Sequence, residues 1–290
     1  MPDPVFLDYT QAELDVAYDQ RPWAPTMDDT LARNVAASEI VRGRLRHDAA
    51  VPYGPTPDEV VDVFPAATAK APVHVFVHGG RWLRRIRPNN HFLAETFVSA
   101  GVTFVALGFG VIPDVRLPVM VEQIRRGIVW LHGNIARFGG DSDRLHVSGH
   151  SSGGHLAAVL LTTDWRQYGL PADAVKSGVC ISGMYDLHPV MLSARGEYLG
   201  LSAEEIDALS PIRHLDRLRG PITVAYGDRE SPEFQRQARD FAAALRAASH
   251  RVELICAAGD NHFEILGRLG RADDALGRAA LRSLGITCPK

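Results

Sequence analysis

The sequence has few cysteines, little net charge and no long apolar run, and each of these features excludes a class of protein. The three cysteines, Cys180, Cys256 and Cys288, have no C-x-x-C spacing, which argues against a disulfide framework and a structural zinc site. Cys180 and Cys256 lie in apolar, strand-like runs, so we interpret both as core residues. We therefore expect a protein of a reducing compartment, the cytoplasm.

The charge and hydropathy of the chain argue against nucleic acid and membranes as partners. The formal net charge is −3, so no overall field draws the chain to nucleic acid or to an anionic lipid surface. The first residues include neither a basic nor an apolar segment of the kind found in signal peptides. No run of about 18 apolar residues is present that would span a bilayer. The expected partner is a small-molecule substrate, and self-association as a homodimer stays open.

Short apolar runs alternate with segments of helical periodicity along most of the 290 residues. We predict strands at 60–65, 73–80, 102–107, 144–149, 179–182, 222–227 and 252–256, and helices at 89–100, 118–138, 152–162 and 232–249. Such alternation is typical of a mainly parallel sheet with helices on both faces. We therefore predict one α/β domain over residues 1–290, which is long enough to bury a large core.

Two segments depart from this alternation. Residues 1–50 are predicted to be an N-terminal helical extension, followed by a turn-rich connector at 51–59. Residues 185–218 separate two strands and contain one helical piece at 202–210. An insertion of this kind is usually a cap or lid beside a site, and the alternative is a helical excursion that only covers the sheet.

The stretch Gly149-His150-Ser151-Ser152-Gly153 follows a predicted strand and opens a predicted helix. In that context a G-x-S-x-G pattern indicates a nucleophile elbow, a sharp turn that exposes the hydroxyl of the central serine. We therefore predict Ser151 as a nucleophile. The alternative is a glycine-rich connection without chemistry, which the strand before it and the helix after it disfavour.

A serine nucleophile needs a base and an acid that orients the base. His262 follows the last predicted strand, which places it at the carboxyl edge of the sheet where such sites lie. For the acid we predict Glu230, three residues after Gly227 at the end of the preceding strand. Asp228 is the alternative, and Asp260 is a weaker one because it is only two residues from His262.

An oxyanion hole is predicted from a second glycine motif. His78-Gly79-Gly80-Arg81 ends an earlier strand, and glycines there let backbone N–H groups approach a substrate oxygen. We expect the N–H groups of Gly80, Arg81 and Ser152 to form the hole. His78 is interpreted as a structural residue that holds the loop through its side chain.

Four arginines, Arg81, Arg84, Arg85 and Arg87, cluster after this loop. A guanidinium can bind a carboxylate through two parallel hydrogen bonds. We predict this substrate-binding role for Arg81 because of its place in the motif, and interpret the other three as parts of a solvated loop. Trp82 is predicted to line the substrate pocket, and a buried aromatic anchor is an equal alternative.

These motifs resemble the α/β-hydrolase superfamily and, within it, the kynurenine formamidase (arylformamidase) group of esterase-like enzymes. The resemblance covers most of the chain and includes HGGRW, GHSSGGHLAAVLL, SPEFQRQARDFAAAL and GDNHFEIL. It implies an α/β-hydrolase fold with a small cap, and a triad acid just before SPEF, which is Glu230. Two motifs differ from the family pattern: Arg81 replaces an aromatic residue, and LGFGVIPDVRLP replaces a tyrosine-containing segment. The predicted substrates are therefore amides, formamides or esters of small aromatic compounds that can bear a carboxylate.

The predicted reaction is two-step acyl transfer through an acyl-enzyme, without a metal or organic cofactor. Ser151 attacks, His262 moves the protons and Glu230 orients His262. A short-chain carboxylesterase without a formamidase role is one alternative, because the same triad serves both reactions. A non-catalytic binding protein on a hydrolase fold is the other; loss of a triad residue would have favoured it, and all three are present.

Overall fold

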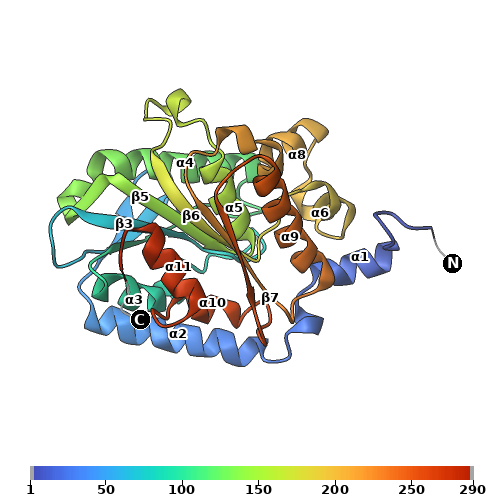
Figure 1. Ribbon diagram of the computed structural model, residues 1–290, viewed down its shortest axis with the longest axis horizontal. Helices are drawn as coiled ribbons and strands as arrows, with labels where there is room; N and C mark the ends of the chain where they lie inside the picture. The colour runs from blue at the N-terminus through green and yellow to red at the C-terminus, as the bar shows by residue number, and fades with distance from the viewer. Residues whose placement is uncertain (1–2, 288–290) are drawn as a thin grey trace.

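A computed structural model describes residues 3–287 as an eight-stranded sheet between layers of helices (Figure 1). Cys288 lies outside the described residues. The strand order is β1-β2-β4-β3-β5-β6-β7-β8. The strands are β1 Asp48–Pro52, β2 Val60–Phe64, β3 Ala71–Val77, β4 Thr103–Leu107, β5 Gly140–His150, β6 Val175–Ile181, β7 Ile222–Gly227 and β8 Val252–Ala257. The pairs β1–β2 and β2–β4 are antiparallel and the other pairs are parallel, which confirms the predicted fold class.

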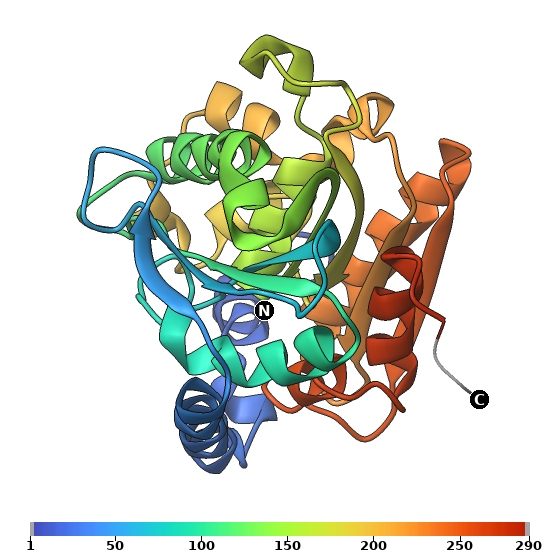
Figure 2. The same cartoon turned by 90° about the vertical axis from the view of Figure 1, so that its left-hand side faces the viewer.

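Helices cover both faces of the sheet, and Figure 2 shows the two layers from the β1 side. One face packs against α4 (Leu117–Asn134), α5 (Ser152–Leu161) and α9 (Pro232–Ala247). The opposite face packs against α2 (Met27–Arg44), α3 (Ala94–Ser99), α10 (Ile265–Leu269) and α11 (Ala275–Ser283). Among the described residues, no helix combines the length and the apolar character needed to cross a bilayer.

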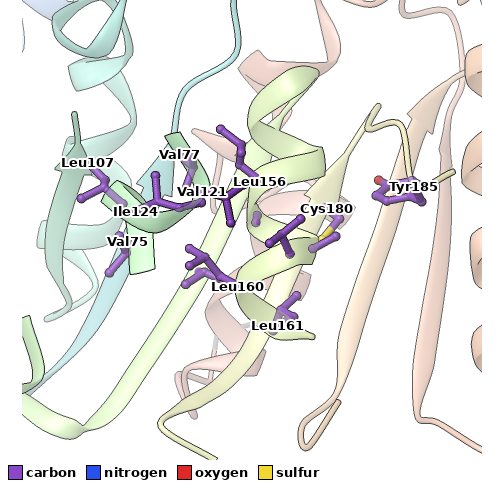
Figure 3. Close-up of a cluster of buried hydrophobic side chains, with 14 of the residues drawn as sticks. Val75, Val77, Leu107, Val121, Ile124, Leu156, Leu160, Leu161, Cys180 and Tyr185 are labelled. Carbon is purple, nitrogen blue, oxygen red and sulfur yellow. The ribbon is translucent and has the colours of Figure 1, made fainter. Parts of the chain in front are cut away.

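The central strands are continuous apolar runs because both of their faces are covered. Every residue of β3 is buried, and so is every residue of α5. Figure 3 shows β3 and β4 side chains packed against α4 and α5, among them Val75, Val77, Leu107, Val121, Ile124, Leu156 and Leu160. Burying each of these side chains contributes about 1.5–3 kcal/mol. This packing fixes the end of β5 relative to the start of α5, where Ser151 lies.

The observed elements differ from the predicted ones mainly at their ends. The predicted connector at 51–59 begins inside β1, and the predicted strand at 144–149 extends over all of β5. The interpretation of Cys256 as a core residue is wrong: β8 is an edge strand and Cys256 is exposed, whereas Cys180 in the central strand β6 is buried.

Both segments outside the alternation are helical. The N-terminal segment contains α1 (Gln11–Tyr18), a 3-10 turn at Arg21–Trp23 and α2. The insertion at 185–218 contains α6 (His188–Leu192), α7 (Gly196–Leu199) and α8 (Ala203–Leu209). In Figure 1, α6 and α8 lie beside the end of the sheet that α1 also approaches.

Candidate active site

Ser151 lies on a strained turn between β5 and α5. Its backbone has φ 58° and ψ −125°, a conformation that few non-glycine residues adopt. The turn is tight enough to require its glycines. A Cβ atom added at Gly149 would lie 2.0 Å from the Gly153 carbonyl oxygen, and one at Gly153 would lie 2.1 Å from the Val77 carbonyl oxygen. This is the geometry expected for a nucleophile elbow.

Three buried side chains form a hydrogen-bonded chain at this turn. The Ser151 Oγ lies 2.9 Å from His262 Nε2, and His262 Nδ1 lies 3.1 Å from Glu230 Oε2. With Nδ1 protonated and donating to the carboxylate, Nε2 is free to accept the serine proton. The structure therefore brings together the three residues that the sequence predicted as nucleophile, base and acid.

Glu230 is held by donors from two neighbouring strands. Its Oε1 accepts hydrogen bonds from Ser182 Oγ at 2.5 Å and from the Gly227 N–H at 2.8 Å. Ser182 follows β6 and Gly227 ends β7. Because Oε1 is occupied in this way, Oε2 is the oxygen that faces His262. Sequence reasoning did not identify Ser182, although its place just after a central strand is a usable signal.

The two alternative acids have other partners. Asp228 is exposed, and its Oδ1 accepts a hydrogen bond of 2.8 Å from the Gly259 N–H. Asp260 pairs with Arg268, with Nη2 2.9 Å from Oδ1. The structure places Glu230, and neither of these two carboxylates, at hydrogen-bond distance from His262.

His150, between β5 and Ser151, supports His262 from a second side. Its Nε2 donates to the backbone carbonyl of His262 at 2.7 Å, and the two ring centres are 4.7 Å apart. Burial, together with the charge that His262 can carry, lowers the pKa of His150 to about 3. His150 is therefore neutral near pH 7 and can donate this bond without placing a second charge in the site. Sequence reasoning did not single out this role.

The loop after β3 faces the elbow. Gly80 (φ 115°), Arg81 (φ 60°) and Trp82 (φ 60°) all have left-handed backbone conformations. Within residues 3–287, the N–H groups of Gly80, Arg81 and Ser152 donate to no protein acceptor. Such unpaired donors are what an oxyanion hole requires. The Trp82 N–H donates to Ser152 Oγ at 3.2 Å, which ties this loop to the elbow.

Two side chains of this loop have structural contacts. His78 Nδ1 lies 2.8 Å from the Gly79 carbonyl oxygen, and its ring stacks on Phe109, so the contacts agree with a structural role. Trp82 is 1% exposed, packs edge-on against His155 and does not line the pocket. The prediction that Trp82 lines the pocket is therefore wrong; the alternative, a buried anchor, describes it.

Ser151 opens into a cavity of about 190 Å³. Its lining includes Gly79, Gly80, His150 and His262. The N-terminal segment also lines it, through Asp19, Gln20, Arg21, Met27, Leu31 and Asn34, and so do further residues of the loop after β3. The insertion at 185–218, predicted to be a cap or lid, contributes Arg195 alone. The N-terminal segment therefore contributes more to the lining than the insertion does.

The arginines after the oxyanion loop divide into two pairs. Arg81 and Arg84 line the cavity. Arg85 is ion-paired with Asp58 at 2.6 Å, and Arg87 is ion-paired at 2.6 Å with Asp62, a carboxylate that is almost fully buried. Arg84 and Arg85 are exposed, as the interpretation of a solvated loop expects, although Arg84 also lines the cavity. For Arg87 the interpretation is wrong, because its partner Asp62 is buried.

The N-terminal segment is hydrogen-bonded to the loop that carries Glu230 and to the loop that carries His262. Gln20 Nε2 donates to Ser231 Oγ at 2.8 Å, directly after Glu230. Asn261 Nδ2, directly before His262, donates to Thr26 Oγ1 at 2.9 Å. The wall of the cavity and the positions of the acid and the base are therefore parts of one hydrogen-bonded structure.

Comparisons with known proteins show which proteins the chain resembles. The model of the BD-FAE family matches residues 61–245, a span that contains Ser151 and Glu230. The chain is 32% identical to kynurenine formamidase of Danio rerio, over 94% of this chain and 96% of that protein. It is 30% identical to esterase LipC of Mycobacterium tuberculosis, over 71% of this chain and 57% of that protein. A solved structure from Silicibacter sp. TM1040, provisionally assigned as a thioesterase, is 25% identical with a TM-score of 0.79, over 94% of this chain and 98% of that one.

Proposed function

The chain belongs to the BD-FAE family of α/β-hydrolases and is a hydrolase of esters or formamides, and from this premise we propose that Ser151, His262 and Glu230 catalyse the reaction. The observation that carries the proposal is the unbroken chain of hydrogen bonds, 2.9 Å and 3.1 Å long, that begins at Ser151 and His262 in the lining of the cavity. Its chemistry is acyl transfer through a covalent acyl-enzyme.

The proposed reaction has two steps. His262 Nε2 takes the proton of Ser151 as Oγ attacks the carbonyl carbon, and the N–H groups of Gly80, Arg81 and Ser152 receive the developing oxyanion. His262 then protonates the leaving amine or alcohol, and afterwards activates the water that releases the acid. Each oxyanion donor lowers the barrier by roughly 3 kcal/mol.

We propose a formamide of an aromatic amine as the substrate class, with Arg81 beside its carboxylate. The similarity to kynurenine formamidase of Danio rerio over nearly the whole chain supports this choice. The second candidate is a short-chain carboxylesterase, which the similarity to esterase LipC and the small cavity favour. The two differ in the leaving group that His262 must protonate, an amine in one case and an alcohol in the other.

Turnover of N-formylkynurenine beside p-nitrophenyl acetate tests the proposal, with Ser151→Ala as the control. Cleavage of the formamide that depends on Ser151 supports the formamidase. Cleavage of the ester with a negligible formamide rate supports the carboxylesterase. Turnover of either compound that survives Ser151→Ala contradicts the assigned nucleophile.

We also propose the cytoplasm as the location and a small molecule as the partner. Cys180 and Cys256 are free thiols, which suits a reducing compartment. A homodimer remains a proposal that light scattering on the purified protein tests directly.

A further inference from the structure

Arg195 is a buried cation in the wall of the cavity that contains Ser151. Only 4% of its surface is exposed. Its Nε and Nη2 donate to the backbone carbonyl of Tyr18 at 3.1 Å and 2.5 Å, and its Nη1 faces the Met184 sulfur at 3.3 Å. In the described part of the chain, no carboxylate lies within ion-pair distance of this guanidinium.

Only some of the N–H donors of this guanidinium have a hydrogen-bond acceptor in the protein. A guanidinium has five N–H donors and stays protonated in proteins. One carbonyl and one sulfur, which is a weak acceptor, leave two of the N–H groups without a protein partner. The rings of Tyr18 and Phe234 lie 5.8 Å and 5.6 Å from the guanidinium carbon and offset part of the charge. A buried charge without a counter-ion is costly, so a natural role for it is to bind an anion.

The other charged residues that line the cavity also favour the binding of an anion. Arg21, Arg81 and Arg84 also line it, and Asp19 is the single carboxylate among the described lining residues. Asp19 is already ion-paired with Arg21 at 2.6 Å. Burial is the main cause that lowers the pKa of Arg195, and the positive charge of Arg81 lowers it further, against the opposite effect of Tyr198, Tyr18 and Asp19. The cavity therefore carries excess positive charge inside low-dielectric walls, which concentrates the attraction for an anion.

We propose that Arg195 is a specificity-determining residue that binds a carboxylate of the substrate, so that this hydrolase acts on anionic substrates. The proposal rests on the proposed function in one respect, that Ser151 in the same cavity is the nucleophile. Two free N–H groups of a guanidinium match the two oxygens of a carboxylate. Arg81 is exposed and therefore screened by water, so the buried Arg195 contributes more to discrimination.

Ligand binding to the Ser151→Ala protein tests the inference without any turnover. The probes are anthranilate and anthranilamide, which differ in whether the ring bears a carboxylate or a neutral carboxamide. Calorimetry should give an affinity for anthranilate about 10- to 100-fold higher than for anthranilamide. This ratio corresponds to the free energy that a hydrogen bond between charged groups contributes. Adding Arg195→Met should remove this difference, and adding Arg195→Lys, which keeps the charge but not the fork, should retain part of it.

A matched variant separates charge from packing. Tyr18→Phe removes hydrogen bonds to Glu233 and Gln237 but keeps the Tyr18 carbonyl that Arg195 contacts. If Arg195 acts only through packing, Tyr18→Phe and Arg195→Met should weaken both probes equally. If Arg195 binds the carboxylate, Arg195→Met alone should change the ratio of the two affinities. Should Arg195→Met fail to fold, Arg195→Lys still reports the ratio.

Equal affinities for the two probes with Arg195 intact would overturn the inference, even if the protein hydrolyses formamides and esters. A clear preference for anthranilate that depends on Arg195, without Ser151-dependent turnover of any formamide or ester, would overturn the proposed function and leave the anion site in place. The binding assay therefore tests the anion site, and the turnover assay tests the proposed function, independently of each other.

Discussion

Thr26 and Asn261, far apart in the sequence, share a hydrogen bond of 2.9 Å beside the proposed base. The Thr26 hydroxyl also donates to Glu264 Oε1 at 2.6 Å. Asn261 and Glu264 flank His262, so the loop that carries the imidazole is anchored on the N-terminal segment. Precise placement of a base is worth orders of magnitude in rate, which makes this contact relevant to catalysis as well as to stability.

Replacing Thr26 by valine should slow the reaction by about 10-fold in kcat, because the histidine loop loses both hydrogen bonds. Thr26→Ser keeps the hydroxyl and should retain most of the rate. Steady-state kinetics on p-nitrophenyl acetate, with thermal denaturation in parallel, measures both effects. Equal kcat values for Thr26→Val and Thr26→Ser would contradict an anchoring role.

Glu230→Gln should reduce kcat by about 10³- to 10⁴-fold, because a neutral amide neither fixes the required tautomer of His262 nor stabilises its cation. Asp228→Asn is the matched control and should change kcat by less than about twofold, since among residues 3–287 the Asp228 side chain bonds only the Gly259 N–H. The kinetics of both variants should be measured beside circular dichroism. If Asp228→Asn alone abolishes turnover, the assignment of the acid is wrong.

Gly153→Ala should abolish turnover and destabilise the fold, because the new Cβ would lie 2.1 Å from the Val77 carbonyl oxygen. Gly133→Ala offers a control in α4, where no neighbouring atom lies within 4 Å of the added Cβ. That variant should be active and about 1 kcal/mol more stable, since alanine favours the helix. Urea unfolding and p-nitrophenyl acetate turnover test the pair, and an active Gly153→Ala enzyme would contradict the tight elbow.

The protein should lose stability as the pH falls from about 6.5 toward 4. Burial is the main cause that lowers the pKa of five histidines to about 3 or about 4, namely His74, His78, His146, His150 and His155. Their unfolded pKa is about 6.5, so below this pH the unfolded chain binds protons that the folded protein does not. The free energy of unfolding is therefore highest above about pH 6.5 and falls by up to about 1.4 kcal/mol per pH unit for each histidine.

Thermal denaturation between about pH 7.5 and about pH 5 measures this dependence. His74→Phe keeps an aromatic ring stacked on Phe97, removes one of the buried titrating groups and should flatten the curve. The exposed His188 provides the control, and His188→Gln should leave the slope as it is. A melting temperature that does not change over this pH range would contradict the linkage.

The sheet and the catalytic order could be predicted because their signals are local. Buried parallel strands require continuous apolar runs, and the elbow requires Gly149 and Gly153 around Ser151, so each signal lies within a few residues of sequence. The predictions for Cys256 and Trp82 were wrong because the exposure of these side chains depends on the surrounding tertiary structure. Cys256 is exposed because β8 is an edge strand, and Trp82 is buried in a loop where Arg81 and Trp82 both have left-handed backbone conformations.

The fold class and the order of nucleophile, acid and base follow from the sequence alone, because backbone periodicity and tight turns demand particular residue types at close spacing. The surroundings of these catalytic residues depend on the tertiary structure. The N-terminal wall, the Thr26 anchor and Arg195, which has no ion-pair partner within residues 3–287, come from segments far apart in the chain. No local pattern marks them, because their roles depend on packing across the whole domain and on whether a charge finds a counter-ion once it is buried.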